Sequence, residues 1–161
     1  MASISTMVRN LFLRELETVQ RPGQLYDDAV GAYNIFVIRG GLVLITSLVG
    51  VADTVIAAAC QLDFAVDGVA IAATAAITSG IGDVIPIPLD ASGVDVLIPN
   101  IACQPNPTLV ANLAEGQHAG LIAGPGNIVA NATIAPMGAA ELLSFKLQYR
   151  RIDPGASISL T

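Results

Sequence analysis

From residue 33 onward, apolar and polar positions alternate with a period of two, in short runs separated by Gly, Pro, Asp and Asn. Successive side chains of a β-strand point to opposite faces, so this alternation predicts strands. The predicted strands cover residues 34–39, 42–49, 51–66, 69–78, 84–89, 94–98, 119–123, 128–134 and 145–150. About nine short strands, with turns roughly every 8 to 12 residues, predict an all-β fold that is an antiparallel β-sandwich or barrel.

The residues between these runs predict how neighbouring strands connect. Asp67-Gly68 favours a two-residue hairpin, because glycine tolerates a positive φ. Gly40-Gly41 predicts a turn that makes 42–49 the hairpin partner of the preceding strand. Pro86 and Pro88 cannot donate ladder hydrogen bonds, so residues 84–89 are expected to form an edge strand.

The N-terminal segment has a different period. Apolar residues recur there at spacings of three and four, which predicts one face of a short helix that ends at Arg21-Pro22-Gly23. A helix this short is marginal alone, so we expect residues 1–30 to form an arm that packs on a neighbouring subunit or back on its own domain, residues 31–161. The predicted interface residues are Val8, Arg9, Leu11, Phe12, Arg14, Leu16, Val19 and Arg21.

The composition indicates that much apolar surface is covered by something other than water. Apolar residues make up 53% of the chain and charged residues 12%, against about 25% charged in a typical soluble domain. A membrane span over residues 42–62 is not expected, because the run is rich in β-branched residues, contains Gly50 and Asp53, and lacks flanking basic clusters. We therefore predict burial against other copies of the chain or other protein subunits.

Charge is distributed in blocks. Between Gly40 and Phe145 there is no Lys or Arg but there are eight acidic residues, and the seven basic residues lie toward the two ends of the chain. An acidic body argues against nucleic-acid binding by that surface. Two interpretations remain open: the acids mark turns and maintain solubility, or the basic ends dock on an acidic neighbour.

Candidate chemistry is sparse. His118 is the only histidine, and Cys60 and Cys103 lie in apolar or alternating runs that favour buried free thiols. The segment 80–83 resembles a fragment of a phosphate or calcium loop, but it lacks the remaining ligands of either. Asp63 and Asp67 are expected on an exposed strand face rather than in an acid–base pair. The sequence therefore predicts a protein without catalytic residues, cofactor or metal.

One long region of the chain resembles a known protein class. Residues 33–50, with a strand ending in Gly, then Val-Leu-Ile-Thr and Val-Gly, resemble the opening of small virion proteins of tailed bacteriophages. The hairpin at Asp67-Gly68, the Leu147-Gln148-Tyr149 strand and the Asp153-Pro154-Gly155-Ala156 tail continue the pattern, over roughly residues 33–157.

The resemblance implies a capsid decoration (cement) protein on the capsid exterior, typically a homotrimer that contacts the major capsid protein and bridges capsomers. It implies no catalytic residues, nucleic acid or membrane. Another virion component, such as a tail, adsorption-apparatus or head-fibre subunit, is the main alternative. A ligand-binding β domain is a weaker one, because the chain has no Trp and only three Tyr residues to form a stacking platform.

Overall fold

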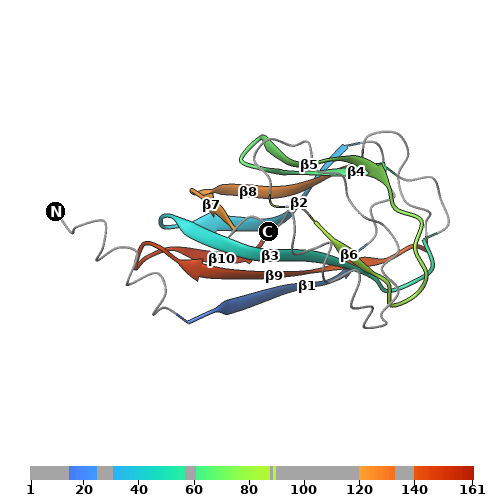
Figure 1. Cartoon of the computed structure of the whole chain (residues 1–161), viewed down its shortest axis with the longest axis horizontal. Coiled ribbons are helices and arrows are strands. Elements are labelled where there is room, and N and C mark those ends of the chain that lie inside the picture. Colours follow the sequence, from blue (N-terminus) through green and yellow to red (C-terminus); the bar gives the residue numbers. More distant parts are fainter. Residues whose placement is uncertain (1–14, 25–30, 57–60, 88, 90–119, 133–139) are drawn as a thin grey trace.

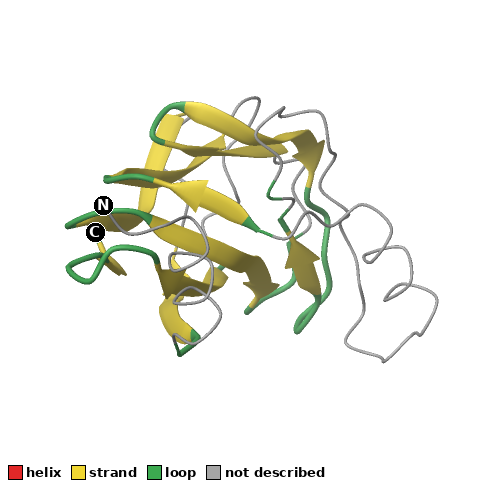
Figure 2. Ribbon diagram, turned by 60° about the vertical axis from the view of Figure 1, so that its left-hand side comes forward, coloured by secondary structure: helices red, strands yellow, loops and turns green. Residues whose placement is uncertain are grey.

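The alternating pattern folds into ten β-strands in the computed structural model, which describes residues 15–24, 31–56, 61–87, 89, 120–132 and 140–161. No helix occurs among these residues (Figure 2), and none of them belongs to a helix that could cross a membrane. The predicted strand 94–98 lies outside the described residues. The strands are β1 (Glu17–Gln24), β2 (Gly31–Arg39), β3 (Val43–Ala52), β4 (Gln61–Val66), β5 (Val69–Ala76), β6 (Val84–Pro86), β7 (Leu121–Ala123), β8 (Gly126–Ala132), β9 (Leu143–Arg151) and β10 (Ser157–Leu160).

The strands form two antiparallel sheets that pack face to face (Figure 1), which confirms the β-sandwich prediction. The first sheet has the order β1-β9-β3-β6, and β7 also pairs with β3. The second sheet has the order β10-β2-β8-β4-β5. All strand pairs within both sheets are antiparallel.

Alternating side chains of both sheets point inward and form one hydrophobic core. On β9, Phe145, Leu147 and Tyr149 are buried while Lys146 between them is exposed, as the sequence predicted. The rings of Phe64 and Phe145, one from each sheet, meet edge to face with centroids 5.7 Å apart. The largest fully buried side chains are Phe36, Phe64, Phe145, Ile35, Ile38, Ile45, Leu48, Ile56, Leu62, Ile71 and Ile77.

Two predictions, one of a hairpin and one of an edge strand, are confirmed. Asp67 and Gly68 have φ values of 49° and 78° and join β4 to β5 as a hairpin. The strand that contains Pro86 pairs with β3 alone in the sheet order, so β6 is an edge strand. In both cases the signal is local: the turn preference of Asp-Gly in the hairpin and the missing N–H of proline in the edge strand.

The predicted hairpin at Gly40-Gly41 is wrong. The strand before this turn, β2, belongs to the second sheet, and the strand after it, β3, belongs to the first. Gly124-Pro125 likewise leads from β7 in the first sheet to β8 in the second. Alternation assigns side chains to faces but does not choose the strand that receives the hydrogen bonds, so a crossing between sheets resembles a hairpin in the sequence.

The predicted C-terminal tail contains a further strand. After the turn at 153–155 the chain enters the second sheet as β10, where Ile158 pairs with Ile38 and is buried. This strand was missed because it has only four residues, among which Ile158 is the single inward-facing apolar side chain between two serines.

The predicted helix is wrong at its C-terminal end, because residues 17–24 form the strand β1 at the edge of the first sheet. Glu17, Val19 and Arg21 lie opposite Tyr149, Leu147 and Phe145 of β9. Their alternation with Thr18 and Gln20 fits a period of two, which the three- and four-residue spacings before them obscured. These residues therefore belong to the sandwich, whereas residues 1–14 and 25–30 lie outside the described residues.

Candidate interaction surface

The residues with the most reactive side chains lie mainly outside the described part of the chain. His118, Cys60 and Cys103 are all in segments that the structure does not describe. Within the described ranges, no group of three or more His, Cys, Asp or Glu residues could hold a metal ion. The acidic residues that the sequence singled out, by contrast, are described.

Two of these acidic side chains, Asp63 and Asp83, have hydrogen-bond partners in their own domain. The Asp83 carboxylate accepts a hydrogen bond of 2.7 Å from the Gly80 N–H, so it closes its own turn. Asp63 accepts one of 2.5 Å from the side-chain amide of Asn131 on the neighbouring strand β8. Asp67 is exposed at the tip of the β4–β5 hairpin. Asp83 therefore closes a turn, and Asp63 links the neighbouring strands β4 and β8.

Three of the eight predicted interface residues are described. Leu16 is 46% exposed just before β1, whereas Val19 packs against the hydrophobic core. Arg21 donates one hydrogen bond to the Ile35 carbonyl on β2 at 2.8 Å and one to the Thr161 hydroxyl, just after β10, at 2.9 Å. Val19 and Arg21 therefore contact the β-sandwich of their own chain. Val8, Arg9, Leu11, Phe12 and Arg14 lie outside the described residues.

Glu17 fastens the start of β1 to β9. Its carboxylate accepts two hydrogen bonds from the Arg151 guanidinium, at 2.5 Å from Nε and 2.6 Å from Nη2. The Tyr149 hydroxyl donates a third, at 2.9 Å, and accepts one of 3.3 Å from the Ile158 N–H. Because Ile158 is on β10, this network also links the edges of the two sheets.

Within the network, the pKa values of Glu17 and Tyr149 shift in opposite directions. The hydrogen bonds from Arg151 hold the pKa of Glu17 below its ordinary 4.5, although partial burial opposes them and Tyr149 supports them. Burial raises the pKa of the Tyr149 hydroxyl above 10.0, and its hydrogen bond to the Glu17 carboxylate acts in the same direction. At neutral pH, Glu17 is therefore an anion and Tyr149 is a neutral donor.

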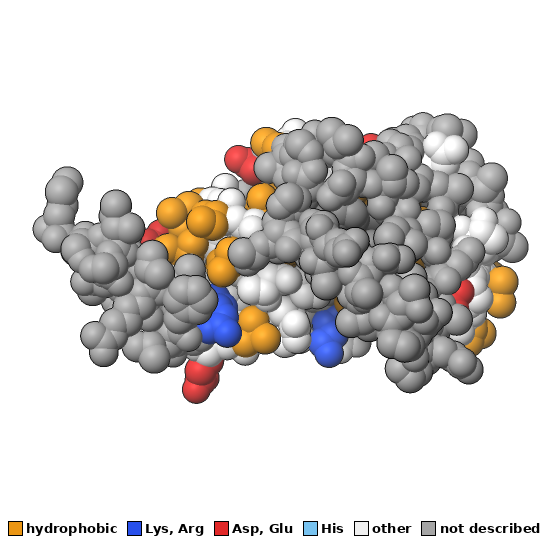
Figure 3. Space-filling model, in the orientation of Figure 1, with side chains coloured by type: hydrophobic (Ala, Val, Ile, Leu, Met, Phe, Trp, Pro, Cys, Tyr) orange, Lys and Arg blue, Asp and Glu red, His pale blue; other side chains and the backbone are white. Residues whose placement is uncertain are grey.

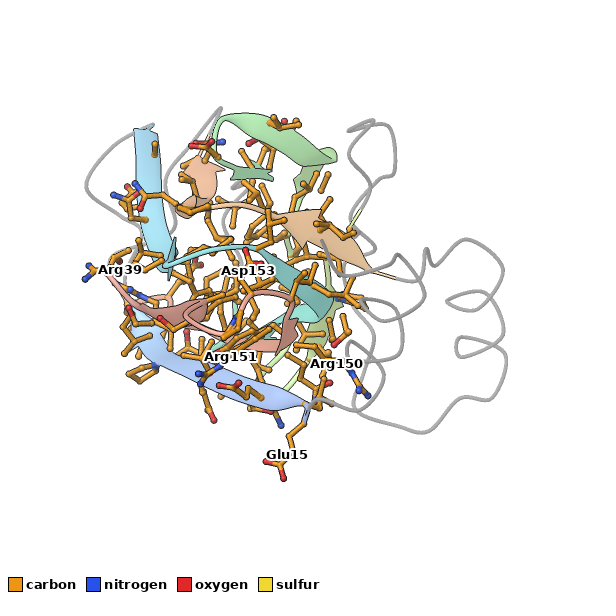
Figure 4. All side chains as sticks on the ribbon, turned by 90° about the vertical axis from the view of Figure 1, so that its left-hand side faces the viewer. Glu15, Arg39, Arg150, Arg151 and Asp153 are labelled. Carbon is orange, nitrogen blue, oxygen red and sulfur yellow. The ribbon has the colours of Figure 1, made fainter. Side chains whose placement is uncertain are left out.

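Two of the motifs that carry the resemblance meet at one corner of the sandwich. The Leu42 N–H donates to the Asp153 carboxylate at 2.7 Å, and the Leu42 carbonyl accepts from Ile152 and Asp153. Gly40 has a φ of 72°, and a Cβ at this position would lie 2.2 Å from the Gly155 carbonyl oxygen. Figure 4 looks onto this end of the molecule, with Asp153 between the labelled arginines. Glycine at position 40 is required because no side chain fits.

The outer face of the first sheet is divided into an apolar half and a polar half. Apolar, half-buried or exposed side chains point outward from β3, β6 and β7, whereas β9 and β1 present Lys146, Gln148, Arg150, Thr18 and Gln20. The only acid within the described strands of this sheet is Glu17, whose carboxylate is bound by Arg151 and Tyr149. The apolar half consists of Leu44, Val49, Val51, Val84, Pro86 and Ile122.

The apolar half is most exposed near the corner. Ile122, opposite Leu44 in the ladder, is 61% exposed, and Leu42 at the adjacent turn is also exposed. Figure 3 shows orange side chains gathered over the region where Figure 1 places β7 and the start of β3, with blue side chains beside them. Large apolar side chains that are exposed together on one surface are typical of a protein-binding site. Comparison with known protein families, curated proteins and solved structures finds no match to this chain.

Proposed function

We propose that this chain is a non-enzymatic virion subunit, a decoration protein that binds the exterior of a tailed-phage capsid as an oligomer. The observation that carries the proposal is the outer face of the first sheet. Only 12% of the residues are charged, and this face exposes Ile122 and carries the half-buried side chains of Leu44 and Val49. Such a surface gains most by being buried against protein.

The corner at Gly40 and Asp153 is explained by the fold and carries no part of the proposal. Residues 33–50 and 153–156 were singled out as separate motifs in the sequence, and their turn residues contact one another directly. The chain crosses between the two sheets at this corner, so the fold itself accounts for these contacts. The proposal of a virion role then depends on the outer face and on experiment.

The first test is the oligomeric state of the full-length protein. We expect a stable oligomer, most simply a homotrimer, because a lone subunit would leave the apolar half of the outer face in water. Multi-angle light scattering and sedimentation velocity at micromolar concentration measure this directly. A stable monomer under those conditions contradicts the proposal.

The second test is location in the particle. The protein is added to purified capsids that lack it, and electron cryo-microscopy shows whether it lies over the junctions between capsomers. We also expect the decorated shells to rupture at a higher temperature than undecorated ones, because a bound oligomer holds several capsomers together. Density at the tail, the adsorption apparatus or a head fibre would instead support the alternative virion role.

A further inference from the structure

We propose that the N-terminal segment of one copy of this chain, residues 1–14, docks on the outer face of the first sheet of a second copy. The proposal rests on the proposed function, since it identifies the contact that holds the oligomer together. The docking site is a row of side chains that crosses the sheet from β1 to β7 at one end of the sandwich. Burial of apolar side chains, and not charge, stabilises this contact.

The row follows from the register of neighbouring strands. Arg150 of β9 lies opposite Leu44 of β3, and Leu44 lies opposite Ile122 of β7. Ile122 is 61% exposed, Leu44 is half-buried, and the exposed Leu42 directly precedes β3. The described residues therefore leave an apolar strip at this end of the sheet in contact with water, where Figure 3 shows orange side chains.

The N-terminal segment joins the sandwich at the same end of the sheet. Glu17, the first residue of β1, lies opposite Tyr149, the residue before Arg150. Leu16, the residue before Glu17, is an exposed apolar side chain at the β1 side of the row. In Figure 1 the start of β1 and β7 lie toward the same end of the molecule. Residues 1–14 therefore join the sandwich at the level of the row.

The segment has the side chains and the length to cover this row. Leu11 and Phe12 follow Val8 by three and four residues, which predicts one apolar face of a short helix. Such a short helix is marginal in water, so its apolar face needs a protein surface. From β1 to β7 the row crosses three strand spacings, or about 14 Å, and a helix of about twelve residues spans about 18 Å. A short helix can therefore lie along the row.

The direction of the chain favours a second copy over the same copy. β1 pairs antiparallel with β9 and begins near the end of β9, so a chain that continued the line of β1 backward from Glu17 would pass beyond the sheet. To lie on its own row, the segment would have to turn sharply just before β1. Residues 11–16 contain no Gly, Pro, Asn, Asp or Ser, which are the residues that turns mostly use. The segment is therefore better placed to reach the row of a neighbouring copy.

Docking of this kind has a consequence for symmetry. Each copy donates one segment and receives one, so the contact joins two different surfaces. Such heterologous contacts close into a ring when the rotation between neighbouring copies is suitable. A ring of three copies is the homotrimer of the proposed function. It covers the row of every subunit and leaves no segment without a partner.

The first experiment changes one apolar residue on each surface of the full-length chain and measures sedimentation velocity. Ile122→Asp places a charge on the row, and Phe12→Asp places one on the segment. We expect each to weaken association roughly tenfold or more, because a carboxylate in an apolar contact loses its hydration. The matched control is Ile81→Asp, which makes the same change at a 70% exposed side chain in the turn beside the other end of β3. Its association should stay within about threefold of wild type.

The second experiment mixes the two variants, one of them fluorescently labelled, at the same concentration. The Ile122→Asp chain keeps an intact segment and the Phe12→Asp chain keeps an intact row, so one docking contact can form between them. We expect a heterodimer with one chain of each variant, whereas each variant alone stays monomeric. A segment that covers the row of its own chain gives no such heterodimer.

Three results would overturn the proposed docking. They are an oligomer that withstands Ile122→Asp or Phe12→Asp, equal weakening by Ile81→Asp, and two monomeric variants that form no heterodimer on mixing. Each of these leaves the proposed function standing, because the wild-type chain still associates. A monomeric wild type would instead contradict the proposed function itself.

Discussion

The two sheets of the sandwich are alike on their inner faces and different on their outer faces. Inside, each contributes bulky aliphatic side chains and aromatic rings to one core. Outside, the first sheet carries Lys146, Arg150 and an apolar half, whereas the second carries small and polar residues such as Asn34, Asn127 and Ser159 with Asp63. The inner faces hold the fold together, and the outer faces differ in the polarity of their side chains.

The comparison separates two kinds of constraint on the same strands. On β9, the inward residues Phe145 and Leu147 are fixed by packing, and many apolar side chains of the right volume would fit a core. The outward Lys146 makes no described contact that the fold requires, so its position reflects solubility or a partner. Substitutions on the inner faces should therefore change stability, and those on the outer face should change association.

The largest expected effect is at the contact between the inner faces. Phe145→Ala in the first sheet and Phe64→Ala in the second should each lower the free energy of unfolding by about 3–5 kcal/mol, because each leaves a cavity beside the other ring. Urea denaturation monitored by circular dichroism measures both. Similar losses would show that the sheets contribute equally to one core.

The double variant sharpens this result. If the edge-to-face contact stabilises the fold by itself, the loss in Phe64→Ala/Phe145→Ala should be smaller than the sum of the single losses by about 0.5–1.5 kcal/mol. Additive losses would mean that the rings act only through the volume they fill. A small loss for one of the two single variants would contradict the equivalence of the inner faces.

The next largest effect is at the corner where the chain crosses between sheets. Gly40→Ala and Gly68→Ala both place a side chain on a residue with positive φ, 72° and 78° respectively. At Gly68 a Cβ would meet nothing within 4 Å, so we expect only the conformational cost of about 1–2 kcal/mol. At Gly40 it would collide with the Gly155 backbone, which should add about 1–3 kcal/mol.

We compare the free energies of unfolding of the two variants, measured by heating and in urea. Their difference separates the cost of the collision from the conformational cost. Equal destabilisation would show that residues 40 and 155 separate easily and that the corner is not a rigid link. A much larger loss at Gly40 would show that the two sheets depend on this contact for their relative placement.

The sequence predicted what depends on local pattern. The alternation of Phe145, Leu147 and Tyr149 with Lys146 identified β9 and its buried face, and Asp67-Gly68 identified a true hairpin. These features follow from two or three adjacent residues. They do not depend on which distant strand lies alongside, so single-chain reasoning is sufficient for them.

The sequence did not predict what depends on distant partners. Whether Gly40-Gly41 leads to a hairpin or to the other sheet is decided by β9 and β10, more than one hundred residues later in the chain. The role of Glu17 was also missed, because Arg151 and Tyr149 lie far from it in sequence and only strand register brings them together. The one local signal was the alternation of Glu17, Val19 and Arg21, which competed with an apolar spacing typical of a helix.

The smallest expected effect concerns Glu17, which ties the edge strand β1 to the first sheet. Its folded-state pKa is lowered, so its ion pair and hydrogen bonds contribute stability above the ordinary value of 4.5. This contribution is lost as the pH falls through the lower, folded-state pKa. Glu17→Gln removes the titration and keeps the shape, so its stability should change less than that of wild type on acidification below pH 4.5.

The measurement is the free energy of unfolding from urea titrations at a series of pH values from neutral to acidic. Glu15→Gln is the matched control, because Glu15 is exposed and projects away from the labelled arginines in Figure 4. Subtracting the control from Glu17→Gln isolates the contribution of the bound carboxylate. The difference should be largest at neutral pH and shrink toward acid, since protonated Glu17 no longer forms an ion pair with Arg151. A difference that does not depend on pH would show that the ion pair of Glu17 does not hold β1, which would then depend on its backbone ladder, Val19 and Arg21.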